Sequence, residues 1–418
     1  MRLLYVVASA VLFCSVAIAQ TKCGPWNPCP KDKPCCSLYG ECGTGAYCLG
    51  ACDFKHSYNE SSCAPLPVCK DQHYTFEDTS SIVQQDEYDG DPDKYGWTTN
   101  GKVLSHKGKA LLIMEKESFG TVITSTRAIW YGKVSAKLKT SHGPGVVSAF
   151  ILMSGSKDEI DYEFVGSDLD HAQTNYYYQG VLNHTNSEKI GVSNTYDNYH
   201  TYEIDWQPEA IHWSIDGTAV RTLKREDTYN ETTKSYHFPQ TPSSIYLSLW
   251  PGGSSKNGEG TVQWAGGPID WSMKELVEKP GYLWAAIDSI SIKCYDSPKI
   301  PDDLDADNAY IFTSKSGTEK DVDYVQTHRK IEPAPKSQKN STNAPDDKEF
   351  KANLEGDPFH GAKKKEKEKE RDRSNENKKG FKNNEKSKQT VEKSMATTYQ
   401  QSSLLALNIL VIALLLIY

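Results

Sequence analysis

The cysteines of this 418-residue chain are distributed very unevenly. Eleven occur in all, and nine of them fall between Cys23 and Cys69. So short a stretch cannot bury enough apolar surface for a core of its own, so we expect disulfides to stabilise it. Zinc is the alternative for dense cysteines, but the spaced CxxC pairs of a zinc ribbon are absent. The cysteines therefore predict a small disulfide-rich module at residues 20–64, and their spacing leaves the pairing open.

The N-terminus has the pattern of a secretory signal peptide. Arg2 precedes the apolar run LLYVVASAVLFCSVAIA, which ends in a small-x-small cleavage pattern before Gln20. We predict that residues 1–19 are removed on secretion and that Cys14 leaves with them. Secretion would place the other cysteines in an oxidising compartment. Four N-x-S/T sequons fit that location and are predicted glycosylation sites: Asn59, Asn183, Asn230 and Asn340.

The C-terminus carries a second apolar run, LLALNILVIALLLIY, ending at Tyr418. It is short for a membrane span. The small residues of SMATT and the polar spacer TTYQQSS precede it, an arrangement typical of a signal for a GPI anchor. We predict a GPI propeptide at residues 395–418 with Ser394 as the attachment site. A C-terminal membrane helix is the alternative.

A charged linker is predicted upstream of that signal, at residues 315–393. Residues 363–388 hold 12 Lys or Arg and 6 Asp or Glu, a local net charge of +6, whereas the whole chain has a net charge of −8. Such a composition cannot bury enough apolar surface to offset chain entropy, so we expect disorder. Contact with anionic wall polymers or headgroups is another use for this charge. The net negative charge of the chain argues against a nucleic-acid partner.

The region between residues 70 and 296 reads as an all-β domain. Short β-type segments such as VVSAFILM and SIYLSLW are separated by turns rich in Gly, Pro and Asn, and long helical periods are absent. Asp216-Gly217 lies between two such segments and predicts a tight hairpin. We expect an antiparallel β-sandwich, preceded by the small disulfide-rich module.

Within this domain, the segment KDEIDYEFVG at residues 157–166 alternates acids with apolar residues. The period of two predicts a strand with one apolar face (Ile160, Tyr162, Phe164) and one acidic face (Glu159, Asp161, Glu163). An exposed acidic strand or a calcium site is the alternative, although a calcium loop needs a glycine turn and lies outside strands. Three neighbouring carboxylates cannot all ionise freely, so at least one pKa should rise.

Residues 23–52, CGPWNPCPKDKPCCSLYGECGTGAYCLGAC, resemble the hevein-like, family 18 chitin-binding module. In that family a serine and three aromatic residues contact N-acetylglucosamine. Ser37, Tyr39 and Tyr47 match, but Glu41 replaces the third aromatic residue, which should weaken binding by on the order of 1 kcal/mol. A module that keeps its scaffold and has lost much of its affinity is the alternative. The resemblance and a count of the remainder imply these pairs: Cys23–Cys36, Cys29–Cys42, Cys35–Cys48, Cys52–Cys63 and Cys69–Cys294.

The acidic segment resembles the ExDxE signature of glycoside hydrolase family 16, which has a β-jelly-roll fold. The order of TSTRAIWYGKVSAKLK, DEIDYEF, TYEIDW and LSLWPGG matches as well. With the module in front and the GPI signal behind, the chain resembles the fungal Crh-type wall transglycosylases. The resemblance implies a catalytic domain at residues 70–296, chitin as donor, and β-glucan or chitin as acceptor. It also implies a location in the cell wall or on the outer face of the plasma membrane, and no cofactor or metal is predicted.

The same resemblance assigns roles to the acidic strand. Glu159 would be the nucleophile and Glu163 the acid/base of a retaining reaction, with Asp161 between them. That reaction needs two carboxyl groups about 5–5.5 Å apart, whereas Cα atoms four residues apart on a strand are roughly 13 Å apart. The two side chains must therefore lean together. Hydrolysis by an endo-chitinase or endo-β-glucanase, and a wall-anchored lectin, are the alternative functions.

Further substrate-binding residues are predicted from the strand period and the resemblance. Trp250 is the expected sugar platform, and Asn175 should lie on the strand beside the acids. Arg127 should either bind hydroxyl groups or pair with a carboxylate. The predicted set also includes Tyr246 on the strand face of Trp250, and Thr261 and Gln263 on another strand. Three tryptophans are expected in the core: Trp206, Trp213 and Trp264.

Overall fold

The computed structural model describes residues 21–298 and 308–326. The predicted signal peptide, Asn340, Ser394, the propeptide and most of the predicted linker lie outside the described residues. Within these two ranges, no helix is both long enough and apolar enough to cross a membrane.

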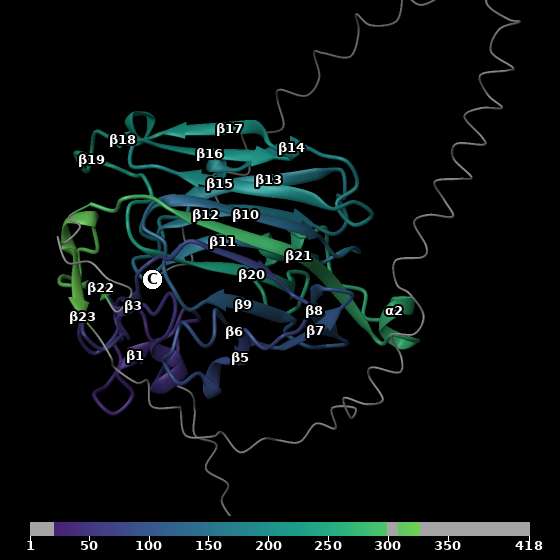
Figure 1. Cartoon of the computed structure of the whole chain (residues 1–418), viewed down its shortest axis with the longest axis horizontal. Helices are drawn as coiled ribbons and strands as arrows, with labels where there is room; N and C mark the ends of the chain where they lie inside the picture. The colour runs from purple at the N-terminus through teal and green to yellow at the C-terminus, as the bar shows by residue number, and fades with distance from the viewer. Residues whose placement is uncertain (1–20, 299–307, 327–418) are drawn as a thin grey trace, which may run out of the picture. The chain divides into compact units, whose positions relative to one another are not determined.

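Two eight-stranded sheets form a β-sandwich (Figure 1). We call the one that contains the acidic segment the acid-bearing sheet. Its order is β14 (Glu188–Gly191), β13 (His171–Tyr177), β12 (Glu159–Val165), β11 (Val146–Ser154), β20 (Ser243–Pro251), β9 (Thr121–Ser125), β6 (Trp97–Asn100) and β5 (Ile82–Gln84).

The second sheet covers the apolar face of the acid-bearing sheet. Its order is β17 (Thr218–Lys224), β16 (Ala210–Ile215), β15 (His200–Trp206), β10 (Gly132–Lys139), β21 (Tyr282–Cys294), β8 (Lys109–Glu115) and β7 (Lys102–His106), with β4 (Gln72–Thr75) also beside β21. The predicted all-β sandwich is confirmed. The hairpin between β16 and β17 is also as predicted, since Asp216 and Gly217 have φ of 51° and 78°.

The remaining elements of the described residues are short. They comprise two α-helices, several small strands and five 3₁₀ helices: α1 (Glu259–Trp264), α2 (Lys274–Val277), β1 (Cys35–Cys36), β2 (Cys42–Gly43), β18 (Tyr229–Asn230), β19 (Ser235–Tyr236), η1 (Gly45–Cys48), η2 (Gln85–Glu87), η3 (His184–Asn186), η4 (Arg225–Thr228) and η5 (Glu319–Asp321).

Strand β12 is fixed by its apolar face. Ile160, Tyr162 and Phe164 are at most 2% exposed and belong to the core between the sheets. The Tyr162 hydroxyl donates to the carbonyl of Ser214 on β16 at 2.9 Å, and Trp213 Nε1 donates to the carbonyl of Asp161 at 3.1 Å. Buried polar groups need such partners, so these bonds hold the backbone of β12 to the second sheet.

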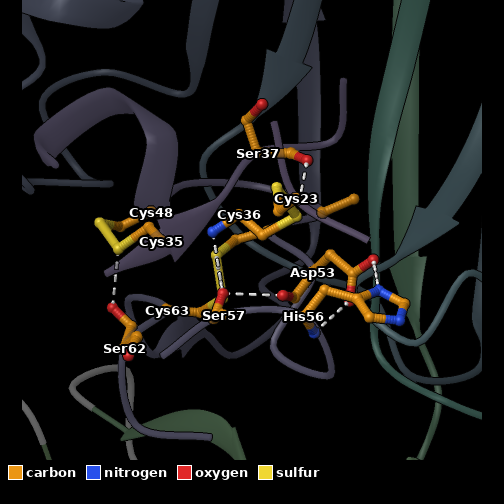
Figure 2. Close-up of a disulfide and its surroundings, with 12 residues drawn as sticks. Cys23, Cys35, Cys36, Ser37, Cys48, Asp53, His56, Ser57, Ser62 and Cys63 are labelled. Carbon is orange, nitrogen blue, oxygen red and sulfur yellow. Dashed lines mark hydrogen bonds and ion pairs between the residues drawn. A yellow bond between two sulfur atoms is a disulfide. The ribbon is translucent and has the colours of Figure 1, made fainter. Parts of the chain in front are cut away.

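The N-terminal module is built around four disulfides, and Figure 2 shows the surroundings of Cys23, Cys35, Cys36, Cys48 and Cys63. The backbone N–H of Cys36 donates to Ser57 Oγ at 2.9 Å, and that hydroxyl donates to the carbonyl of Asp53 at 2.7 Å. The structure joins the cysteines in the pairing implied by the resemblance: Cys23–Cys36, Cys29–Cys42, Cys35–Cys48, Cys52–Cys63 and Cys69–Cys294.

The module packs directly against the sandwich. Its Ala51 N–H donates to the Tyr246 hydroxyl of β20 at 2.8 Å. A second bond joins Lys55 of the module to Gln179 in the loop after β13, where Lys55 Nζ donates to Gln179 Oε1 at 2.9 Å. The sequence offered no sign of this contact, because each bond joins residues more than a hundred positions apart.

A third sheet corrects the predicted start of the linker. Strand β22 (Asn308–Phe312) pairs with β3 (Leu66–Pro67) and with β23 (Val322–Gln326). Residues 315–326 are therefore folded, and the prediction of disorder from residue 315 is wrong over this part. The reason is aromatic packing: Phe312 stacks on Phe54 of the module at 4.0 Å, and Tyr310 packs edge-on against Trp130 at 5.7 Å.

Candidate active site

The acids of β12 share one face of the acid-bearing sheet with residues from neighbouring strands. Asp161 lies opposite Asn175 on β13 and opposite Ile151 on β11. Figure 1 shows the strands of this sheet side by side. Ile151 in turn lies opposite Tyr246 on β20. Since paired residues of neighbouring strands point to the same side, this face carries the acids, Asn175 and Tyr246 together. The predicted position of Asn175 is confirmed.

Burial raises the pKa values of both Glu159 and Glu163. Loss of solvent raises the pKa of Glu159 to about 7, against a partial lowering by a hydrogen bond with Asp161. Loss of solvent and the charge of Glu159 raise the pKa of Glu163 to about 8. Glu163 therefore keeps its proton at a pH at which Glu159 has begun to lose its own. This difference suits a general acid beside a nucleophile.

Asp161 is the most deeply buried of the three acids. It is 1% exposed, and neither of its carboxyl oxygens receives a hydrogen bond from an N–H or O–H group of the described residues. Burial and the charges of Glu159 and Glu163 raise its pKa well above the ordinary value. A hydrogen bond with Glu159 raises the pKa of Asp161 further and lowers that of Glu159.

Asp158, the residue just before β12, has a different environment. It is fully buried, yet it accepts hydrogen bonds from the N–H groups of Gln179 and Gln240, both at 3.0 Å, and from the Thr241 hydroxyl at 2.6 Å. These donors come from two other loops. Asp158 therefore connects the start of β12 to the loops around it.

Lys157 is a site residue that the sequence analysis did not identify. Its Nζ is buried and has no hydrogen-bond acceptor among the described residues. Burial lowers the pKa of Lys157, and the carboxyl groups of Asp53 and Glu159 oppose that shift. Its charge favours the ionised form of Glu159. Lys157 also has a left-handed φ of 71°, in the turn that leads into β12.

The aromatic part of this face is only partly as predicted. Tyr246 and Trp250 share one face of β20, because they lie opposite Ile151 and Val147 of β11. Trp250 stacks against Trp264 with ring centroids 6.2 Å apart. Trp206 and Trp213 are core residues as predicted, but Trp264 is half-buried, and its Nε1 donates to Gln173 Oε1 at 2.9 Å. The prediction that Trp264 lies in the core is therefore wrong.

Thr261 and Gln263 also differ from the prediction. They lie on the helix α1, which follows a glycine-rich loop, and not on a strand. Gln263 Nε2 donates to Glu259 Oε1 one turn earlier, at 3.0 Å. The four residues TVQW fit a period of 2 as well as a helical turn, so the alternation could not decide between them.

Arg127 lies in a network apart from the acids. Its Nη1 donates to the carbonyl of Val68 at 3.1 Å, and its Nη2 pairs with Asp93 at 3.1 Å. Of the two roles expected for Arg127, the structure shows the pairing with a carboxylate.

Two more residues on the acidic face escaped the sequence analysis. Gln173 lies opposite Glu163, and Tyr177 lies opposite Glu159, both on β13. Burial raises the pKa of Tyr177 to about 12. The alternation of Gln173, Asn175 and Tyr177 in QTNYYYQG was the available signal, because a period of 2 puts all three on one face.

The predicted contact residues of the module gather in one place. Ser37, Tyr39 and Tyr47 line a pocket of about 850 Å³, together with Glu41 at the position where the family has an aromatic residue. Tyr39 is 63% exposed. Tyr47 lies over Gly43, where a Cβ would be 2.4 Å from the ring, so no side chain fits at that position.

Of the predicted glycosylation sites within the described residues, Asn183 is exposed, and Asn59 and Asn230 are partly exposed.

Comparison with known proteins agrees with this geometry. Residues 91–266 match the family model for glycosyl hydrolases family 16. The β-sandwich and the three neighbouring acids on one strand therefore define a glycosyl hydrolase.

Two relatives and one solved structure define the class of glycosyl hydrolase more closely. The chain is 47% identical over 321 residues to Congo red hypersensitive protein 2 of Saccharomyces cerevisiae, covering 74% of this chain and 68% of that protein. It is 49% identical over 311 residues to Crh-like protein 2 of Aspergillus fumigatus, covering 74% and 70%. A solved structure of Crh5 transglycosylase in complex with NAG is 29% identical, with a TM-score of 0.51, covering 63% of this chain and 97% of that one. The chain therefore belongs to the Crh-like proteins of glycosyl hydrolase family 16. It is an enzyme that acts on glycosidic bonds, as a cell-wall glycosidase or transglycosylase.

Proposed function

We propose that the protein cleaves chitin and transfers the released segment to β-glucan or to another chitin chain. The observation that carries this proposal is the set of three acids on β12, two of which have pKa values raised to about 7 and about 8. The solved Crh5 transglycosylase in complex with NAG supports both transfer and an amino-sugar ligand.

In this proposal, Glu159 attacks the anomeric carbon of the donor while Glu163 protonates the departing glycosidic oxygen. The donor then remains as an ester on Glu159. Glu163, now ionised, removes the proton from a hydroxyl group of the acceptor, which attacks the same carbon and releases Glu159. Two inversions give net retention of configuration.

Asp161 acts on the nucleophile in this scheme. As a neutral carboxyl it donates a hydrogen bond to Glu159, which lowers the pKa of Glu159 and favours the ionised nucleophile. Trp250, stacked with Trp264, offers an aromatic surface for a sugar ring on the same sheet face. Half-buried Ile151 and Met153 lie opposite Asp161 and Glu159 on β11. Such apolar neighbours bind water poorly, which favours a sugar hydroxyl as the second reactant.

We further propose that the protein acts outside the cell, held to the membrane or wall by a GPI anchor at Ser394, and that the module holds chitin. The five disulfides support an oxidising compartment. The signal sequences themselves lie outside the described residues.

The test is a transfer assay with purified mature protein, a chito-oligosaccharide donor and a fluorescent β-glucan acceptor. Labelled hybrid products are expected, analysed by chromatography and mass spectrometry. Shortened donor without hybrids would show a hydrolase. Retention on insoluble chitin without either product would favour a wall-anchored lectin.

A further inference from the structure

The pocket on the module is not confined to the module. Its other wall belongs to the acid-bearing sheet, with Asn100 of β6, Val122 of β9 and Tyr246 of β20 facing Tyr39 and Tyr47. The module and the β-sandwich therefore line one cavity.

That wall lies on the same face of the sheet as the acids. Val122 lies opposite Ser248 on β20, Ser248 opposite Ala149 on β11, and Ala149 opposite Glu163 on β12. This row crosses the strands in a straight line. Three strand spacings of about 4.8 Å put Val122 roughly 14 Å from Glu163 along the sheet, a distance that a few linked sugars cover.

The module is held at a fixed orientation beside this row. Gln85 Nε2 of η2 donates to the carbonyl of Ala46 at 3.1 Å, and Ala51 N–H donates to the Tyr246 hydroxyl at 2.8 Å. Gly50 has a left-handed φ of 56°, and a Cβ there would be 2.6 Å from that same hydroxyl. The module therefore cannot turn freely about a linker, and its binding face remains directed at the sheet.

The pocket also has the chemistry of a site for a neutral polysaccharide. Tyr39 and Tyr47 offer aromatic rings, while Ser37, Gln84 and Asn100 offer uncharged hydrogen-bonding groups. The charged residues of the lining are one cation and two acids, Lys33, Glu41 and Asp86, so no single charge dominates the pocket. Tyr39 is accessible to a ligand, since it is 63% exposed. Rings combined with amide and hydroxyl groups suit the faces and edges of sugars.

We propose that the module and the acid-bearing sheet form one extended site, in which a single donor chain of β-linked N-acetylglucosamine lies on Tyr39 and Tyr47 and continues along the sheet to its scissile bond at β12. The module then contributes distal subsites to the reaction, in addition to any role as an anchor. This inference rests on the proposed donor.

The experiment compares a tetrameric and an octameric chito-oligosaccharide as donors, using the full mature protein. Two variants change the pocket from opposite walls: Tyr39→Ala on the module and Val122→Trp on the sheet. Trp26→Ala is the matched control, because Trp26 is a module aromatic that is 97% exposed and does not line the pocket. Circular dichroism and Tm establish that each variant is folded.

In the parent protein, the octamer is expected to have the higher kcat/KM. Each pocket variant should reduce that advantage about ten-fold, mainly through KM, in line with the loss of one aromatic contact or its obstruction. Trp26→Ala should keep the advantage. An octamer advantage that is unchanged in folded Tyr39→Ala and Val122→Trp would overturn the proposal. If Val122→Trp does not fold, the exposed Tyr39 position alone decides.

The assay separates this inference from the proposed function. Hybrid products without any effect of donor length would contradict the extended site and leave the transferase intact. If no donor is turned over, the proposed function fails, and calorimetric Kd values for the two oligomers then test the extended site alone. An octamer preference that Tyr39→Ala removes would support it, and equal Kd values would contradict it.

Discussion

Asp158 and Asp161 are buried aspartates three residues apart, and they differ in what surrounds them. Asp158 accepts three hydrogen bonds from two loops, whereas Asp161 accepts none from the N–H and O–H groups of the described residues and lies between two glutamates. Burial raises the pKa of both. The supply of hydrogen-bond donors, and not burial, therefore distinguishes an acid that stabilises the fold from one available for chemistry.

Asp158→Asn should give the largest effect on stability. The new amide would direct an N–H group at donors such as the Thr241 hydroxyl or the Gln240 N–H, leaving buried groups unpaired. The expected cost is roughly 2–4 kcal/mol in the free energy of unfolding. Chemical denaturation measures it. A loss below about 0.5 kcal/mol would contradict the structural role assigned to Asp158.

Asp161→Asn should reduce activity and leave stability nearly unchanged, the opposite of Asp158→Asn. No donors are displaced, so the free energy of unfolding should change little. The amide is a weaker donor to Glu159 than a carboxylic acid, so we expect kcat to fall about 10–100-fold. Initial transfer rates and a denaturation curve on the same sample check both halves. Normal kcat together with a large loss of stability would reverse the comparison.

Glu163→Gln tests whether the raised pKa of Glu163 makes the free energy of unfolding depend on pH. In the folded protein the pKa of Glu163 is about 8, above its ordinary value of 4.5. Its contribution to stability is therefore complete below pH 4.5 and is lost as the pH rises through 8. Glutamine cannot ionise, so the variant should gain on the parent between pH 5 and 9. We expect on the order of 1–2 kcal/mol, discounted because the side chain is partly exposed. If the free energies of unfolding of the variant and the parent differ by the same amount at every pH, the raised pKa of Glu163 is contradicted.

Lys157→Met should give the smallest change. Removing this cation takes away an interaction that favours ionised Glu159, so the pKa of Glu159 should rise. The acidic limb of the kcat/KM profile should therefore move upward, by about half a pH unit. Lys157→Arg keeps the charge and is the matched control. A downward shift in the methionine variant would refute the assigned direction.

The sequence was informative where the signal is local. The period of 2 predicted β12 and its two faces, and Asp216-Gly217 predicted a hairpin. Asp158 could not be understood in this way, because two of its three donors, Gln240 and Thr241, are more than 80 residues away in sequence. Short patterns such as TVQW at residues 261–264 were also ambiguous, because they fit a strand as well as a helical turn.

The same limitation applies to the boundaries of the folded part. The strands at residues 308–326 were missed, because their stability comes from contacts such as Phe312 on Phe54 rather than from local composition. The orientation of the module toward the sheet likewise depends on contacts between distant residues, such as Ala51 with Tyr246. The local sequence of residues 308–326 or of the module cannot predict such contacts between distant residues.

Trapping the glycosyl-enzyme tests directly whether Glu159 is the nucleophile. Glu163→Gln is incubated with an activated aryl chito-oligosaccharide, whose leaving group needs no proton. The intermediate should then form and persist, because the variant lacks a base for the second step. Peptide mass spectrometry should locate the adduct on Glu159, and Glu159→Gln should show neither adduct nor transfer. An adduct on another residue, or near-normal transfer by Glu159→Gln, would show that Glu159 is not the nucleophile.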